Sequence, residues 1–166
     1  MRFSETRIAN GLVKDIERIY DKAKRNPKNF MDRGTATVGG KQTDNALFLR
    51  DFRDLIPPIN VIKGFIEREV GTELAWQWVH FVEYDKGGRQ ELHNHQECEE
   101  ISFILYLNDC RGGMTAFTYA DKITHWKEVL PKRGRMVFFS SDINHYALPA
   151  LSKKKVMVGG LKRPKL

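Results

Sequence analysis

Apolar residues near the N-terminus recur at three- and four-residue intervals, the spacing of one face of an amphipathic helix. The series consists of Ile8, Leu12, Val13, Ile16, Ile19, Tyr20 and Ala23. Asn26-Pro27 follows the series, and because proline cannot continue a helix, the pattern predicts a helix that ends near residue 26.

A second apolar series, within residues 61–70, predicts another helix. Pro57-Pro58 is expected to break the chain before this helix. Asn60 is then expected to cap the helix and Gly71 to end it. The first half of the chain is therefore predicted to be mainly helical.

From Glu73 onward the pattern becomes that of β-strands. Two sets of residues alternate, with Trp76, Trp78, His80 and Val82 in one and Gln77, Val79, Phe81 and Glu83 in the other. A nearly continuous apolar run at 101–107 indicates a strand buried on both faces. Further strands are expected at 114–119, 129–131, 136–140 and 155–161. Short strands joined by turns predict an α+β chain that is mainly β, with N-terminal helices and a jelly-roll core.

Length and composition are those of one globular domain. The chain has 166 residues, of which 41% are hydrophobic, and we expect helical support over 1–72 and a β core over 73–166. No apolar run reaches the length needed to span a bilayer, and Met1-Arg2-Phe3 lacks the apolar segment of a signal peptide. The two cysteines, Cys98 and Cys110, do not indicate a disulfide framework. These features predict a cytoplasmic protein.

The chain is basic. It carries 28 Lys and Arg residues against 21 Asp and Glu residues, which gives a net charge of +7. Six of the cations lie in the last fourteen positions, namely Lys153, Lys154, Lys155, Lys162, Arg163 and Lys165. A solvated tail therefore explains much of the charge, and a nucleic-acid partner is retained as a weaker alternative.

A cluster of metal-ligand residue types, His93-Asn94-His95-Gln96-Glu97, lies between two predicted strands. Side chains two apart on a strand share a face, so His93, His95 and Glu97 are expected to point the same way. A third ligand must come from a distant segment, and His145 is the best candidate because it follows a predicted strand. Two histidines and one carboxylate on one face define non-haem Fe(II) oxygenases. A zinc site from the same residues is an alternative, although the cysteines lack zinc-ligand spacing.

Four further segments resemble a known family. They are Tyr84-Asp85-Lys86-Gly87, the strand from Ser102 to Asp109, Gly112-Gly113-Met114-Thr115-Ala116-Phe117, and the stretch from Pro131 to Phe139. His93 follows Gly87 by six positions, and Lys155 follows His145 by ten. From Tyr84 to Lys155 the chain resembles the 2-oxoglutarate- and Fe(II)-dependent dioxygenases, specifically their prolyl 4-hydroxylase-like branch. The His-x-His variant is similar to small proteins of marine phages, so a phage origin, with the host cytoplasm as location, is one expectation.

The resemblance implies a double-stranded β-helix that binds Fe(II) and 2-oxoglutarate, with ascorbate as a further candidate cofactor. Lys155 has the family's spacing for the cation that pairs with the distal carboxylate of 2-oxoglutarate, a charge that is costly to bury alone. Tyr84 and Thr115 would add hydrogen bonds to the co-substrate. Oxidative decarboxylation to succinate and CO2 would accompany hydroxylation of a C–H bond. Peptidyl proline is the first substrate expected, and a protein or peptide the expected partner.

One departure from the family pattern leaves the metal ligands open. The family has His-x-Asp or His-x-Glu, whereas this chain has His93-x-His95. If the spacing from Gly87 decides, His93 and His95 bind the metal with His145, and Glu97 orients an imidazole from outside. If the chemistry of the motif decides, His95 and Glu97 form the pair, and Glu97 replaces His93. His95 is common to both interpretations.

Two rival functions fit the same residues. One is a cupin-like metalloenzyme with three histidine ligands that does not use 2-oxoglutarate. The other is a non-enzymatic basic β-sandwich that binds a nucleic acid or a protein. In all of these interpretations Lys153 and Lys154 belong to a solvated turn, and His80 and His125 are surface or capping residues.

Two loops are expected to determine substrate specificity, because binding residues in such folds lie on loops. They cover residues 31–56 and 119–128. Within the first, residues 31–45 are rich in turn formers. That stretch predicts a mobile loop or short hairpin near the mouth of the site, with a disordered linker as an equal alternative.

Overall fold

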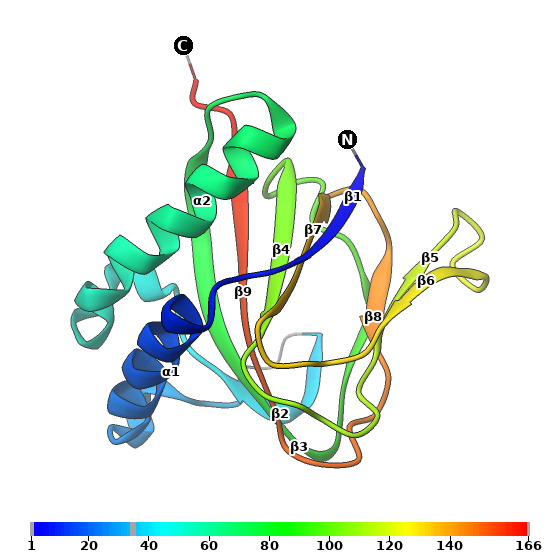
Figure 1. The fold of residues 1–166 in the computed structure, drawn as a ribbon. Helices are drawn as coiled ribbons and strands as arrows, with labels where there is room; N and C mark the ends of the chain where they lie inside the picture. The colour runs from blue at the N-terminus through cyan, green and yellow to red at the C-terminus, as the bar shows by residue number, and fades with distance from the viewer. Residues whose placement is uncertain (1, 34–35, 166) are drawn as a thin grey trace.

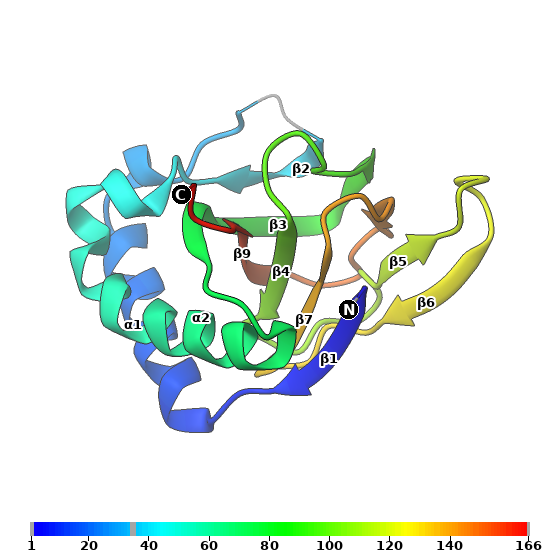
Figure 2. The same cartoon turned by 90° about the horizontal axis from the view of Figure 1, so that it is seen from above.

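Two long helices cover one face of a curled antiparallel sheet (Figure 1, Figure 2). The structure is a computed structural model that describes residues 2–33 and 36–165. The helices are α1 (Asn10–Lys24) and α2 (Ile56–Val70), and the short 3-10 helices η1 (Pro27–Asn29), η2 (Ala46–Phe48) and η3 (Arg50–Leu55) lie between them. The prediction of a mainly β jelly roll with N-terminal helices is confirmed.

The sheet contains nine strands within the described residues, and all their pairings are antiparallel. They are β1 (Phe3–Arg7), β2 (Thr37–Gln42), β3 (Ala75–His93), β4 (Ile101–Tyr106), β5 (Thr115–Thr118), β6 (His125–Val129), β7 (Arg135–Ser140), β8 (His145–Ala147) and β9 (Lys154–Lys162). Their order is β1-β7-β4-β9-β3-β8-β5-β6, and β2 pairs with β3. Seen from above, the sheet curls around an interior on the side away from the helices (Figure 2).

Helix α1 forms where the apolar series predicted it. It buries Val13, Ile16, Ile19, Tyr20 and Ala23, all members of that series. Most of these side chains join the core between the helices and the sheet. No helix in the described part of the chain is long and apolar enough to cross a membrane.

Helix α2 begins earlier than predicted. Pro57 and Pro58 lie inside its first turn, so they do not break the chain before it, and Asn60 is not its cap. The first N–H groups of a helix have no acceptor within the helix, and prolines at these positions therefore lose no hydrogen bond. Gly71 ends α2 as predicted, in the left-handed conformation (φ +73°) that glycine adopts easily.

The region 1–72, predicted to be helical support, also contributes two strands to the sheet. β1 pairs with β7, and its sequence Phe-Ser-Glu-Thr-Arg has too little apolar alternation to reveal a strand. β2 pairs with β3. Met31 forms an antiparallel bridge with Gln42, so the two ends of the stretch 31–42 lie side by side, as the short hairpin among the predicted alternatives requires. Residues 34 and 35 of this stretch lie outside the described residues.

Strand β6 covers residues 125–129, so the short strand predicted at 129–131 was placed too late. β6 pairs with β5, and the two strands form a hairpin that projects beyond β8 (Figure 1). The specificity loop expected at 119–128 is therefore reduced to the tip of this hairpin. Its strand character was hidden because the His-Trp-Lys-Glu-Val segment shows no regular apolar alternation.

A register shift near the start of β3 separates two tryptophans that the alternation had placed on one face. The pairing with β9 shifts between Trp76 and Trp78. Trp76 packs on Phe103 in the core under the helices, with ring centroids 5.6 Å apart, whereas Trp78 lies 5.5 Å from the ring of His95. The regular alternation therefore fails between Trp76 and Trp78, because one extra residue in a strand reverses the direction of the side chains before it.

The sheet has an apolar core on each face. The core under the helices includes Phe52, Phe81, Phe103, Leu105 and Met157. The interior core includes Val82, Tyr84, Ile104, Tyr106, Phe139 and Val156. Neighbouring residues of β3, β4 and β9 thus alternate between two buried environments. A side chain on these strands lies either under the helices or in the interior, and one residue of register decides which.

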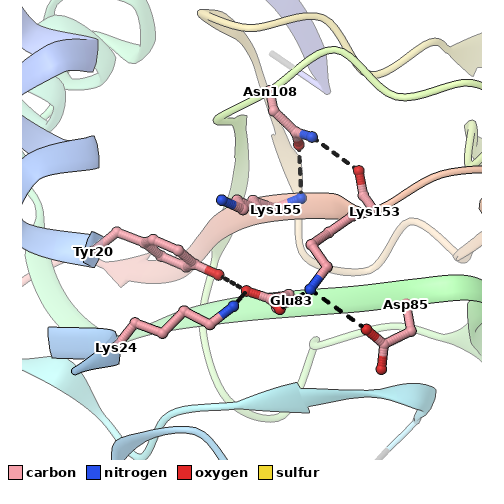
Figure 3. Close-up of polar contacts among 7 residues, drawn as sticks. All are labelled: Tyr20, Lys24, Glu83, Asp85, Asn108, Lys153 and Lys155. Carbon is pink, nitrogen blue, oxygen red and sulfur yellow. Dashed lines mark hydrogen bonds and ion pairs between the residues drawn. The ribbon is translucent and has the colours of Figure 1, made fainter. Parts of the chain in front are cut away.

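A buried carboxylate ties α1 to the sheet on the helix side (Figure 3). Glu83 on β3 accepts hydrogen bonds from the Tyr20 hydroxyl and from the ammonium groups of Lys24 and Lys153, at 2.8 Å for Lys153. Burial alone would raise the pKa of Glu83. The hydrogen bonds, led by that from Lys153, outweigh burial and lower the pKa to about 2.

Glu83→Gln is expected to reduce the free energy of unfolding by roughly 1–3 kcal/mol at neutral pH, because the amide keeps the shape of the side chain but loses its charge. The folded-state pKa of about 2 lies below the ordinary value of 4.5, so the carboxylate stabilises the fold above about pH 4.5 and progressively less toward pH 2. Urea unfolding should therefore show a difference between wild type and variant that shrinks in acid. Asp85→Asn is the control and should leave stability almost unchanged; a difference that persists in acid would contradict this role of Glu83.

Candidate metal and co-substrate site

Three histidines come together in the interior. β3 and β8 pair so that His93 and His145 lie opposite each other, with ring centroids 4.3 Å apart. The ring of His95 lies 4.8 Å from that of His93 and 5.5 Å from that of His145. One ligand atom from each of the three rings lies within 4.8 Å of the others, a spacing that can hold one metal ion.

A turn, and not a strand, carries His95. β3 ends at His93, and residues 96–98 form a turn. Ser141 fixes the turn at two points, because its carbonyl oxygen accepts the His95 N–H (2.8 Å) and its hydroxyl donates to the Glu99 carbonyl oxygen (2.5 Å). The expected strand alternation therefore stops at His93, and the shared strand face predicted for 93–97 is wrong.

Glu97 lies apart from the three histidines. Its side chain is exposed in the turn, and it is not among the residues whose ligand atoms gather. The structure thus brings together the set expected from the Gly87 spacing, namely His93, His95 and His145. It does not bring Glu97 into the place of His93.

Backbone carbonyl groups orient two of the imidazoles. His93 Nδ1 lies 2.7 Å from the Glu91 carbonyl oxygen, and His145 Nδ1 lies 3.0 Å from the Ile143 carbonyl oxygen. A carbonyl oxygen can only accept, so each Nδ1 carries the hydrogen and donates it. The Nε2 lone pairs of His93 and His145 are therefore left available to a metal.

Burial keeps all three imidazoles neutral. It lowers the pKa of His93 and lowers that of His145 well below its ordinary value. Burial, followed by the neighbouring His93 and His80 rings, lowers the pKa of His95 to about 4. Because metal binding requires neutral imidazole, the cluster can accept a metal ion at neutral pH without first losing protons.

Sequence reasoning missed a buried carboxylate beside His95. Glu99 has a fully buried side chain whose Oε1 lies 3.5 Å from His95 Nδ1. Trp78 Nε1 and Ser102 Oγ each donate to this carboxylate at 2.8 Å. Burial raises the pKa of Glu99, while the bonds from Trp78 and Ser102 oppose that rise. The only indication of this contact in the sequence was that Glu99 follows His95 by four residues.

Lys155 does not point toward the histidines. Its Nζ lies over the Tyr20 ring, 5.2 Å from the centroid, on the side of the sheet that α1 covers (Figure 3). Its backbone N–H donates to Asn108 Oδ1 at 2.8 Å. The placement of Lys155 therefore does not support the co-substrate role expected for it, because its side chain leaves β9 on the helix side of the sheet and the histidines lie on the other side.

The neighbouring Lys154 occupies the interior position instead. It is 3% exposed, so the interpretation as part of a solvated turn is wrong for this residue. Its Nζ donates to the Gly113 carbonyl oxygen at 2.8 Å and lies over the rings of Tyr84 (5.0 Å) and Tyr106 (5.8 Å). No carboxylate in the described part of the chain forms an ion pair with it. Burial lowers its pKa to about 8.

Tyr84 and Thr115, both expected to contact the co-substrate, lie near Lys154. Tyr84 pairs with Lys154 in the register of β3 and β9, and burial raises its pKa to about 12. The Thr115 hydroxyl is hydrogen-bonded to the Tyr106 hydroxyl at 2.6 Å. Tyr106 therefore links Thr115 to the surroundings of Lys154, a role that its place in a continuous apolar run concealed.

A cavity of about 370 Å³ opens beside His93 and His95. Its described lining contains no lysine, arginine, aspartate or glutamate, and it includes Trp78 and His80. His80 is therefore part of the cavity wall and not a surface residue. A larger cavity of about 750 Å³ lies between β1 and the β5–β6 hairpin, but none of the three histidines lines it. All three histidines line a small pocket of about 40 Å³, and the 370 Å³ cavity reaches His93 and His95 but not His145.

Three neutral imidazoles and a buried ammonium group without a carboxylate partner fit a metal ion and an anionic organic ligand. On this jelly roll the set differs from the two histidines and one carboxylate of non-haem Fe(II) oxygenases in having a third histidine in place of the carboxylate. Residues 79–161, half of the chain, match the family described as the 2OG-Fe(II) oxygenase superfamily. The chain belongs to this superfamily of enzymes, which require Fe(II) and 2-oxoglutarate.

Solved structures of prolyl hydroxylases have a similar fold. A Pseudomonas putida prolyl-4-hydroxylase is 19% identical, with a TM-score of 0.71 over 98% of this chain and 93% of that chain. The viral collagen prolyl hydroxylase of Paramecium Bursaria Chlorella virus-1, in its 2OG complex, is 15% identical, with a TM-score of 0.70 over 99% and 97%. A prolyl hydroxylase in complex with a hypoxia inducible factor peptide fragment, from Trichoplax adhaerens, is 13% identical, with a TM-score of 0.74 over 96% and 83%. A comparison with curated protein sequences found no match.

Proposed function

We propose that this oxygenase hydroxylates prolyl residues of a peptide, with iron held by His93, His95 and His145 and 2-oxoglutarate held by Lys154. The placement of Lys154 carries the proposal. Its ammonium group is buried on the interior face of the sheet, as the histidines are, and has no carboxylate partner among the described residues. A buried charge of this kind is costly when unpaired, and the distal carboxylate of 2-oxoglutarate would neutralise it.

The co-substrate cation is thus assigned to Lys154, nine positions after His145, in place of Lys155. Tyr84 and Thr115 keep the supporting roles expected for them. Tyr84 is the cross-strand neighbour of Lys154. Hydroxyl groups beside an ammonium group can donate further hydrogen bonds to a bound carboxylate. Beside a lysine at the surface, water would make these hydrogen bonds instead.

When bound, iron and 2-oxoglutarate supply O2 activation coupled to decarboxylation of 2-oxoglutarate to succinate and CO2. The residues of the chain bind and orient these groups. Phe139 and Phe117 lie 4.9 Å and 5.9 Å from the His145 ring and exclude water from that side of the cluster. The rival metalloenzyme that does not use 2-oxoglutarate is not favoured, because the family requires it.

The lining of the cavity beside the histidines favours a substrate segment without charge. Trp78 and Val82 offer apolar surface there, and the described lining carries no lysine, arginine or carboxylate. A prolyl ring is uncharged and packs well on aromatic faces. The peptide bound to the Trichoplax adhaerens relative is a further reason to propose a peptide. The nucleic-acid partner suggested by the net charge gains no support from this cavity.

An aerobic assay with Fe(II), 2-oxoglutarate and a panel of proline-containing peptides tests the proposal. We expect succinate to form in proportion to a peptide product that has gained one oxygen atom. The matched control is each peptide with alanine in place of the proline, which should not be modified. Succinate formation without a hydroxylated prolyl peptide would point to another substrate, and no 2-oxoglutarate consumption under any condition would overturn the assignment of the site.

A further inference from the structure

The three imidazoles differ in what faces their Nδ1 atoms. His93 and His145 each have a backbone carbonyl oxygen there, at 2.7 Å and 3.0 Å. The Nδ1 of His95 faces a side-chain oxygen instead, Glu99 Oε1, at 3.5 Å. His95 is therefore the one ligand candidate of the three whose second nitrogen lies against a carboxylate.

Residues of three neighbouring strands fix the position of the Glu99 carboxylate. Trp78 on β3 and Ser102 on β4 each donate a hydrogen bond to it, at 2.8 Å. Gly160 on β9 leaves the necessary space, because a Cβ at that position would lie 2.6 Å from Glu99 Cδ. Three strands thus hold a fully buried carboxylate in one orientation beside His95.

We propose that Glu99 is a positioning residue for His95: it accepts the Nδ1–H, leaves Nε2 to the metal and adds a negative charge behind the imidazole. This inference rests on the proposed function, because it takes His95 as a metal ligand. The separation of 3.5 Å is longer than a good hydrogen bond, so the ring would have to rotate toward Glu99 to form one. Carboxylates that accept from a metal-bound histidine fix its tautomer and raise its basicity.

The charge of Glu99 offsets the loss of the carboxylate ligand that the family pattern has and this chain lacks. The family pattern places a carboxylate two residues after the first histidine, where this chain has His95. Three neutral imidazoles leave the full charge of a divalent metal uncompensated. Glu99 returns one negative charge to the site from behind His95, whereas the exposed Glu97 faces solvent.

Glu99→Gln tests the role of the charge, with Glu97→Gln as the matched control on the same turn. The measurement is the Kd for Mn(II) of the purified, metal-free chain by titration calorimetry. We expect Glu99→Gln to weaken Mn(II) binding by about 10- to 100-fold, the range typical of partners behind a ligand. Glu97→Gln should leave the Kd unchanged. Equal affinity of wild type and Glu99→Gln, or a loss confined to Glu97→Gln, would overturn the proposal.

A second readout separates positioning from a structural role. The thermal midpoint of metal-free Glu99→Gln should stay close to that of metal-free wild type, and the visible spectrum of the Co(II)-loaded variant should differ from that of Co(II)-loaded wild type. A variant that lowers the metal-free midpoint but binds Mn(II) as wild type does would show a structural role and overturn the proposal. If Glu99→Gln does not fold, Ser102→Ala removes one donor to the carboxylate and should weaken Mn(II) binding severalfold; an unchanged Kd would overturn the proposal.

The same titration distinguishes this inference from the proposed function. A wild-type chain that binds no Mn(II) would remove the metal site and the role of Glu99 together. A wild-type chain that binds Mn(II) and turns over 2-oxoglutarate, alongside a Glu99→Gln variant of equal affinity, would remove the role of Glu99 alone.

Discussion

Replacing His145 with alanine is expected to weaken Mn(II) binding by more than about 100-fold and to reduce 2-oxoglutarate turnover to background. His145 is 2% exposed and donates from Nδ1 to the Ile143 carbonyl oxygen, so its Nε2 is fixed toward the other two rings. Removing it leaves two imidazoles two residues apart on one segment, which cannot enclose a metal ion. Titration calorimetry with Mn(II), together with succinate formation under Fe(II), measures both effects.

His125→Ala is the matched control for this substitution. His125 lies on β6, where its two ring nitrogens contact Glu128 (2.7 Å) and Tyr146 (2.5 Å), and it is not part of the metal cluster. Mn(II) affinity and turnover should therefore stay near wild type. A His145→Ala variant that retains the wild-type Kd, with an intact fold by circular dichroism, would show that the histidine cluster is not the metal site.

The second large effect is expected from Lys154→Met, which should weaken 2-oxoglutarate binding by about 2–5 kcal/mol, roughly 30- to 5,000-fold. Methionine fills a similar volume in the interior but cannot pair with the distal carboxylate of the co-substrate. Metal affinity should change little, since Lys154 is not among the metal-ligand residues. Calorimetry with 2-oxoglutarate on the Mn(II)-loaded protein separates the two quantities.

Lys155→Met provides the control one residue along β9, because its side chain lies over Tyr20 on the helix side. Its affinity for 2-oxoglutarate should match wild type. Since the Lys154 pKa is lowered to about 8, wild-type affinity should be constant below that pH and fall about tenfold per pH unit above it. Lys154→Met should lack this dependence. A loss in Lys155→Met but not in Lys154→Met would reverse the assignment.

The opposite directions of the Lys154 and Lys155 side chains show what the sequence could predict of the proposed site and what it could not. The spacing from His145 placed a cation on the last strand, and the structure has one there. The sequence could not predict which face of the sheet this cation lies on. Val156 and Met157 are both buried, and alternation of polar and apolar residues gives no information when both faces are covered. Pairing of Lys154 with Tyr84 across β9 and β3 decides the face, and such pairings are long-range.

The metal cluster was predicted for a reason that the structure only partly supports. The spacing from Gly87 identified His93 and His95, but the strand that was expected to align them ends at His93. His95 is brought into place by Ser141, a residue distant in sequence, which accepts the His95 N–H and donates its hydroxyl to the Glu99 carbonyl oxygen. Glu99 was overlooked for the same reason, because its partners Trp78 and Ser102 belong to strands whose register is fixed by the whole sheet. Local pattern thus predicted the helices and most strands, while the partners of the site depended on tertiary pairing.

The pairing of β8 with β3 has a consequence for how the protein would lose a metal ion. β3 is 19 residues long and is held by β2 and β9 as well, whereas β8 has three residues, pairs with β5 on its other side and carries His145. Short strands fray more readily than long ones with several neighbours, and a bound ion would join the two across the sheet. Amide hydrogens of residues 145–147 would then exchange slowly when the metal is bound and quickly when it is absent. β8, the shortest strand in the described part of the chain, and not the long strand that leads to the other two proposed ligands, would set the rate of metal release.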